Sequence, residues 1–94
     1  MIKKFRKKPV IIEAVQWTGN NEKELKDFVN ESLLRTWNTI THVFTYRIKT
    51  LEGDSYVLQK NDWIIKGVKG EFYPIKNDIF LETYEEINGE IKVE

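Results

Sequence analysis

Alternating apolar and polar positions predict extended strands along much of this chain. In residues 8–17 apolar side chains fill most of both alternating sets of positions, and Glu13 interrupts the run from Val10 to Val15. Successive side chains of a strand point to opposite faces, so the pattern predicts a central strand that is covered on both sides. Pro9 suits the beginning of this strand, where a missing N–H group matters little.

Glu13 is the unusual residue of this strand, because isolated carboxylates are rarely buried. One interpretation is a carboxylate near an edge of the sheet, paired with a lysine. The other is a ligand-binding or acid–base group in a partly apolar pocket, where its pKa would be raised. We favour the first interpretation, because an isolated acid in a strand is usually only a paired charge.

The middle of the chain predicts a hairpin. Residues 42–51 alternate as a strand, and residues 55–59 return after a tight turn. Residues 34–41 are ambiguous, because their threonines favour extended structure while Asn38 interrupts it. They form a loop or an irregular edge strand, and Trp37 within them is either a packing residue or an exposed stacking platform.

The densest apolar and aromatic content lies in residues 61–80. Residues 63–65 and 72–75 predict two antiparallel strands. Gly67 and Gly70 bracket the turn between them, where a positive φ is tolerated. A short helix capped by Asn77 or Asp78 is expected to follow, with an extended conformation of residues 83–87 as the alternative. The residues on the apolar face of this helix are Phe80, Tyr84 and Ile87.

One longer helix is predicted over residues 22–31, with Asn20 or Asn21 as its cap. Its apolar residues recur at helical spacing and form one face that packs on the sheet. These residues are Leu25, Phe28 and Val29.

Together these elements predict an α+β fold: a small antiparallel sheet of four to six strands, one helix packed on it and a short C-terminal helix. The 94 residues make a single domain, whose 40% hydrophobic content suffices for one core. Residues 3–8 form a basic start and residues 82–94 an acidic tail, which we interpret as ends that attract each other or aid solubility. Because a small chain with many aromatic side chains has much surface to cover, a homodimer is expected.

Composition argues against several classes of function. The absence of cysteine removes disulfides, thiolate metal sites and cysteine nucleophiles. A formal net charge of zero makes nucleic acid an unexpected partner, and no apolar run approaches the ~20 residues of a membrane span. No nucleophile–base pair, metal-ligand spacing or phosphate loop is present. We therefore expect a protein that is not an enzyme and that uses neither a metal nor a cofactor.

Three stretches, taken in order, resemble a known group of proteins. The first is KFRKKPVIIEAVQW at residues 4–17, and the second is IKTLEGD at residues 48–54. The third is DWIIKGVKGEFYP at residues 62–74, followed by DIF and TYE. They resemble the small phage and prophage proteins of the PGDYG type over most of the chain except residues 20–45. This chain has Lys-Asn-Asp-Trp where that pattern has Pro-Gly-Asp-Tyr, which keeps a turn followed by an aromatic residue.

The resemblance implies a phage or prophage origin and a location in the host bacterial cytoplasm, and it implies no activity. We expect an accessory protein that acts as a non-catalytic binding module. One hypothesis is that it counteracts host defence by binding a small anionic, nucleotide-like ligand. The alternative is a protein–protein interaction, or a structural phage protein with no small-molecule ligand.

The predicted ligand site is the hairpin turn between residues 66 and 73. Lys66 and Lys69 supply cations, and the turn supplies backbone N–H groups for a phosphate. Arg47, on an outward strand face, is a third cation. Tyr73 or Trp17 supplies a ring on which a base stacks. The simpler alternative is that the lysines only keep an ordinary hairpin soluble.

Overall fold

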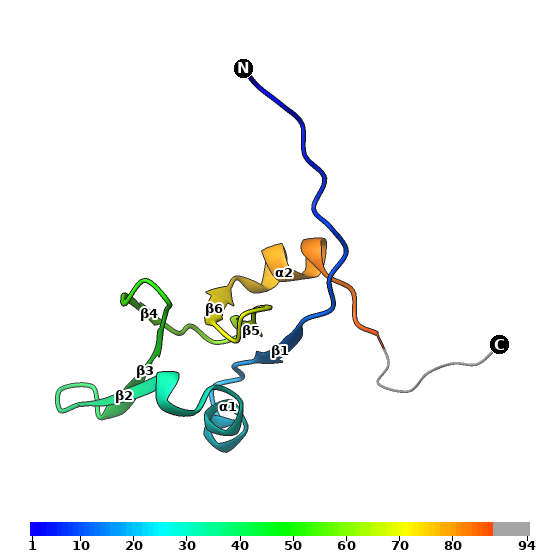
Figure 1. Ribbon diagram of the computed structural model, residues 1–94. Helices are drawn as coiled ribbons and strands as arrows, with labels where there is room; N and C mark the ends of the chain where they lie inside the picture. Colours follow the sequence, from blue (N-terminus) through cyan, green and yellow to red (C-terminus); the bar gives the residue numbers. More distant parts are fainter. Residues whose placement is uncertain (88–94) are drawn as a thin grey trace.

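The computed structural model describes residues 1–87, and it has six short strands and two helices (Figure 1). Residues 88–94, which form the end of the predicted acidic tail, lie outside the described residues. The elements in chain order are β1 (Glu13–Gln16), α1 (Glu22–Val29), the 3₁₀ turn η1 (Asn30–Ser32), β2 (Leu33–Asn38), β3 (Val43–Lys49), β4 (Ser55–Val57), β5 (Trp63–Lys66), β6 (Phe72–Ile75) and α2 (Asn77–Thr83).

The strands form two antiparallel sheets, with the orders β1-β5-β6 and β2-β3-β4. This confirms the predicted α+β fold and the short C-terminal helix. The six strands are divided between two sheets, whereas the sequence analysis placed them in one. The physical reason is the turn after β4: the N–H of Asp62 donates to the carbonyl of Gln59, and the chain then enters β5 beside β1 instead of beside β4.

The prediction of a central strand over residues 8–17 is wrong in both length and position. β1 is an edge strand of four residues, paired only with β5 from Glu13 opposite Lys66 to Gln16 opposite Trp63. Beyond Lys66 the chain turns into the β5–β6 hairpin, so no further residue of β5 remains to pair with residues 8–12. A strand can extend only as far as its partner does, and the alternating pattern does not reveal the partner's length.

The main core lies between the first sheet, α1 and β3. Leu25 and Val29 of α1 are fully buried against Ile48 of β3 and Ile64 of β5, as the predicted helix face required. Phe28 is half-buried and meets the ring of Phe72 edge-on, with 5.5 Å between ring centroids. This packing positions the first sheet against the second.

α2 covers the opposite face of the first sheet. The ring of Phe80 stacks on Trp63 at 4.2 Å between centroids and an interplanar angle of 10°, and Tyr84 lies 5.1 Å from Phe80. The predicted apolar face is therefore present for these two residues. Ile87 lies beyond the end of the helix at Thr83.

The helix ends differ in detail from the predicted ends. α1 ends at Val29, and Asn30 with φ 54° turns the chain into η1. Asn21 is the residue before α1, but its side-chain oxygen accepts from the N–H of Thr18 and caps no helical N–H. Lys76, not Asn77 or Asp78, precedes α2.

The ambiguous residues 34–41 contain most of the edge strand β2 and the turn that follows it. The Asn38 side chain accepts hydrogen bonds from the N–H groups of Ile40 and Thr41, and its carbonyl accepts from the N–H of His42. Asn38 therefore closes the β2–β3 hairpin. Among residues 1–87, no helix has the length and apolar character needed to cross a membrane.

Candidate functional site

In the predicted ligand hairpin, between Lys66 of β5 and Tyr73 of β6, three backbone N–H groups donate to acceptors within the hairpin itself. The N–H of Gly67 donates to the carbonyl of Glu71 at 2.7 Å, and the N–H of Gly70 donates to the carbonyl of Gly67 at 3.0 Å. The N–H of Lys69 donates to the Glu71 carboxylate at 2.9 Å. An acidic side chain of the chain itself thus occupies the place that a phosphate would take.

The other residues of the predicted site lie elsewhere. Trp17 is 5% exposed and belongs to the main core, where its ring packs on Tyr46 at 4.6 Å. Arg47 belongs to β3 in the second sheet, and its side chain alternates with the buried Ile48, so it lies on the face away from the core. The structure brings Lys66, Lys69 and Tyr73 into one hairpin and does not bring Trp17 or Arg47 to it. Burial and the neighbouring Tyr84 hydroxyl raise the pKa of Tyr73.

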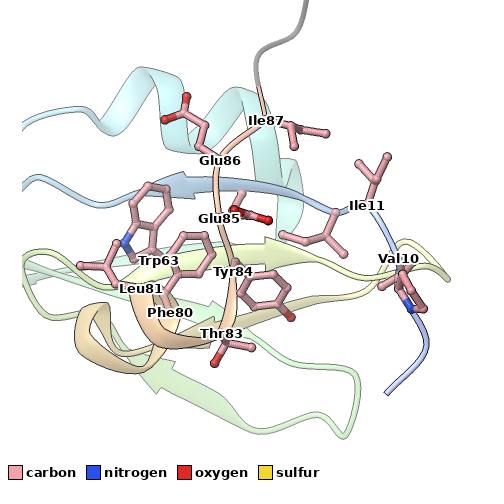
Figure 2. Close-up of a pocket in the computed structure, with 13 residues that line it drawn as sticks. Val10, Ile11, Trp63, Phe80, Leu81, Thr83, Tyr84, Glu85, Glu86 and Ile87 are labelled. Carbon is pink, nitrogen blue, oxygen red and sulfur yellow. The ribbon is translucent and has the colours of Figure 1, made fainter. Parts of the chain in front are cut away.

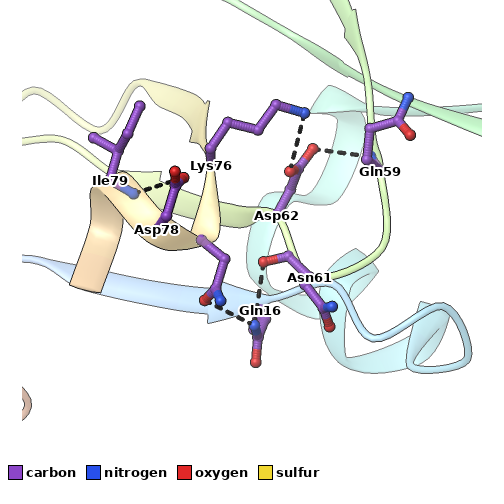
Figure 3. Close-up of polar contacts among 8 residues, drawn as sticks. Gln16, Gln59, Asn61, Asp62, Lys76, Asp78 and Ile79 are labelled. Carbon is purple, nitrogen blue, oxygen red and sulfur yellow. Dashed lines mark hydrogen bonds and ion pairs between the residues drawn. The ribbon is translucent and has the colours of Figure 1, made fainter. Parts of the chain in front are cut away.

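Asp62 is the buried acid among the described residues, and its environment is a satisfied turn (Figure 3). Its carboxylate accepts from the N–H of Gln59 at 2.9 Å and lies 3.4 Å from the Lys76 ammonium. Beside it, the Gln16 amide donates to the carbonyl of Asn61 and to the side chain of Asn77. These contacts give Asp62 a structural role.

The remaining acids are dispersed. Glu13 is exposed on the edge strand β1, opposite Lys66. In residues 1–87 no three His, Asp or Glu side chains gather as a metal site would require.

An aromatic face extends along the β2–β3 hairpin from the core into solvent. We define this aromatic face as Arg35, Trp37, Phe44 and Tyr46, which share one side of the hairpin because Arg35 pairs with Tyr46 and Trp37 with Phe44. Next along the same side, Leu33 pairs with the fully buried Ile48. Exposure rises away from that pair, to 40% at Phe44 and 47% at Trp37. The hairpin therefore extends its apolar side beyond the core that covers it.

The rings of the aromatic face are held in fixed positions. Trp37 and Phe44 meet edge-on with centroids 4.9 Å apart, and the Arg35 guanidinium lies 4.2 Å from the centroid of Phe44. Glu22 of α1 accepts a hydrogen bond from the Tyr46 hydroxyl at 3.0 Å and pairs with Arg35 at 2.8 Å. Burial and this hydrogen bond raise the pKa of Tyr46. Because Glu22 neutralises Arg35, the face presents rings and a paired charge rather than a free cation.

A second surface feature is an apolar groove of about 830 Å³ beside β1 (Figure 2). One wall is the N-terminal segment from Pro9 to Ala14, and the other is formed by α2 and residues 84–87. Figure 2 shows Val10 and Ile11 at one end of the groove and Trp63 and Leu81 at the other. Ile11 is 78% exposed although it lies in the apolar run of residues 9–12.

Sequence reasoning left Trp37 open and missed the groove. The sequence signal for the aromatic face was the alternation of Phe44, Tyr46 and Ile48, which places the three side chains on one side of the strand. It does not show how many of them the core buries. The groove was missed because residues 8–17 were treated as a strand with both sides covered.

Comparisons with known proteins add no relative. No family model matches the chain, and no match to it is found among curated proteins or solved structures. The resemblance to PGDYG-type phage proteins therefore stays a prediction from the sequence.

Proposed function

We propose that this chain is a phage or prophage accessory protein that acts in the host cytoplasm as a dimeric, non-catalytic module binding another protein. The observation that carries the proposal is the exposed aromatic face of the β2–β3 hairpin. Trp, Tyr and Arg are the residue types that dominate the binding energy of protein interfaces. Here they lie together on a supported strand pair instead of being scattered singly.

The aromatic face suits a protein partner because it is already ordered. Trp37 and Phe44 hold each other, and α1 fixes Tyr46 and Arg35 through Glu22. A partner that covers these rings gains apolar burial and orders few additional side chains, which keeps the entropic penalty of association low. The neutralised Arg35 favours a partner surface that is apolar with hydrogen-bonding groups over one that is strongly charged.

The anionic-ligand hypothesis for the Lys66–Tyr73 hairpin is the weaker candidate. A phosphate would have to displace the Glu71 carboxylate from the N–H of Lys69, or bind to the lysine ammonium groups alone. With the N–H groups of Gly67, Lys69 and Gly70 engaged within the turn, the two exposed lysines provide charge but little geometric selection.

The test is site-specific photo-cross-linking in the bacterial host. A photoreactive amino acid replaces Trp37 in one variant and Thr36 in the matched control, because neighbouring strand residues point to opposite sides of the same hairpin. We expect a discrete cross-linked protein from position 37 and none from position 36. Purified wild type should bind that protein, and Trp37→Ala should weaken the binding at least tenfold.

Equal cross-linking from both positions, or from neither, would contradict the proposed protein-binding face. In that case, calorimetric titration with nucleotides and cyclic dinucleotides decides the weaker candidate. Binding by wild type that a Lys66→Ala, Lys69→Ala double variant loses would replace a protein partner with an anionic ligand.

A further inference from the structure

We infer that two copies of this chain pair through the outer edge of β1, with each copy's residues 10–14 lying in the groove beside the other's β1. This inference rests on the dimeric state within the proposed function and not on its protein partner. It commits the groove to one occupant, a second copy of the same segment.

The first step is the direction of the backbone groups of β1. The N–H of Trp17 donates to the carbonyl of Asp62, just beyond the pairing of Gln16 with Trp63, so Trp17 faces β5. Backbone groups alternate in direction along a strand, so Val15 and Glu13 also face β5, while Ala14 and Ile12 face outward. In residues 1–87 no strand pairs with this outer side.

The second step is a comparison of the two edges of this sheet. β6, at the other edge, contains Pro74 opposite Ile64. Because Ile64 exchanges its hydrogen bonds with β1, the nitrogen of Pro74 faces the outer side of β6, where it lacks the hydrogen needed to accept a further strand. Proline on an edge is a common device against pairing. β1 has no such block between residues 10 and 16, so it is the edge that can accept a strand.

The third step is the self-complementarity of the segment. An antiparallel pair centred on Ile12 places Val10 of each copy opposite Ala14 of the other, and each such pair exchanges two hydrogen bonds. Moving the centre to Glu13 would set two carboxylates opposite each other, which is unfavourable. Gln16 contributes little, because its carbonyl already accepts from the Asn21 side chain at 2.8 Å. A twofold axis at Ile12 therefore gives the longest pairing.

The fourth step is the fit of the side chains. Opposite residues of paired strands share a face, so Val10 and Ile12 of the second copy lie on the same face as Ala14. That face carries the groove, whose lining includes Tyr84 and Ile87 (Figure 2). Val10, which is 45% exposed in one copy, is thereby covered by the other.

Charge supports the same occupant. Residues 3–8, which precede the paired segment, contain five basic residues and no acid. The groove is bordered by Glu85 and Glu86, both exposed, and Glu82 precedes them on α2. The chain's own Lys7 already donates to the Tyr84 hydroxyl at 3.1 Å beside this acidic border, so a neutral or basic segment suits the groove, whereas a strongly acidic segment would be repelled.

The first experiment measures mass by light scattering at micromolar concentration. We expect wild type to be a dimer and Ile12→Pro to be a monomer, because proline at this position removes an outward N–H and leaves the β1–β5 hydrogen bonds intact. The matched control is Ile11→Pro, whose N–H points toward β5 but lies beyond the last pair, Glu13 with Lys66. It should remain a dimer. Circular dichroism and thermal unfolding of both variants check that each is folded.

The second experiment uses the absence of cysteine from the chain. In Ile12→Cys the two introduced thiols face each other across the twofold axis. The Cα atoms of two residues that exchange hydrogen bonds in an antiparallel pair are about 5.5 Å apart, which is within the range of a disulfide. Mild oxidation should give a covalent dimer. Thr36→Cys, on the exposed edge strand β2, should stay monomeric on the same gel.

Each outcome separates the inference from the proposed function. A dimer that survives Ile12→Pro, or that cross-links through Thr36→Cys instead, would overturn the β1 pairing and leave a dimeric module with another interface. A monomeric wild type at high micromolar concentration would overturn both the pairing and the dimeric state. Neither result bears on cross-linking of a protein partner through Trp37.

Discussion

β5 and the β2–β3 hairpin both carry large apolar side chains, yet they have opposite relations to solvent. Ile64 and Ile65 of β5 are 0% exposed, whereas Trp37 and Phe44 of the hairpin are nearly half exposed. β5 lies between two strands, with the main core on one face and α2 on the other. The hairpin has one covered end and one free end. Apolar content therefore shows what a strand needs to bury, and the neighbouring elements decide whether it does so.

The two tryptophans at half-buried or exposed positions show the same difference in detail. Trp63 stacks on Phe80, and its indole N–H donates to the Asn77 side chain at 2.8 Å. The aromatic neighbours of Trp37 within residues 1–87, Phe44 and His42, belong to its own hairpin. A ring fixed by distant parts of the chain serves the fold, while a ring fixed locally and left open is available to a partner.

The largest expected effect tests this contrast directly. Ile64→Ala should lower the free energy of unfolding by about 2–5 kcal/mol, because it leaves a cavity in a fully covered site. Ile40→Ala, at an exposed position of the hairpin turn, should change it by no more than about 0.5 kcal/mol. Urea unfolding of both variants measures the two values. Similar losses would show that the hairpin is as well covered as β5.

A smaller effect is expected at the carboxylates of the two regions. Asp62→Ala should lower the free energy of unfolding by about 1–3 kcal/mol, because the N–H of Gln59 loses its acceptor in a covered site. Asp62→Asn keeps an acceptor oxygen and should lose less. Glu22→Ala removes a partly exposed ion pair with Arg35 and should cost only about 0–1 kcal/mol.

The same urea titrations measure these variants. If Glu22→Ala proved as damaging as Asp62→Ala, the hairpin would depend on α1 more strongly than its exposure indicates, and the division into a covered and an open region would fail.

Most of the fold was predictable because it depends on local patterns. The apolar face of α1 and the alternating residues of β3, β5 and β6 are properties of short segments, and each was placed within a few residues. The division into two sheets was not predictable, because it depends on one turn near Asp62 that redirects the chain. The shortening of β1 was hidden for the same reason, since its partner's length is set elsewhere.

The candidate site was predictable only in part. The positions of Lys66, Lys69 and Tyr73 in one hairpin follow from the sequence, but the Glu71 side chain that occupies the N–H of Lys69 does not. Arg47 and Trp17 were grouped with the hairpin on chemical type alone, and such grouping carries no information about distance. The sequence could not show whether Trp37 is buried or exposed, because its exposure depends on how far the main core extends along the β2–β3 hairpin.

Tyr46 lies where the covered and open parts of the hairpin meet, and it gives the smallest expected effect. Its pKa in the folded protein is raised above the ordinary value of 10.0, first by burial and then by its hydrogen bond to Glu22. The folded state therefore holds the phenol proton more tightly than the unfolded state does. By linkage, this contribution to stability is full below about pH 10 and is lost as pH rises through the folded-state pKa.

The free energy of unfolding of wild type should accordingly fall more steeply above about pH 10 than that of Tyr46→Phe, which has no proton to lose. Urea unfolding of the two proteins between about pH 8 and 11 gives the difference in slope. Glu22→Gln should give an intermediate slope, because it removes the carboxylate charge that opposes ionisation and leaves the burial of the ring unchanged. Identical slopes for wild type and Tyr46→Phe would mean that the phenol is as open to water as Trp37, and the covered part of the hairpin would then end at Ile48 rather than at Tyr46.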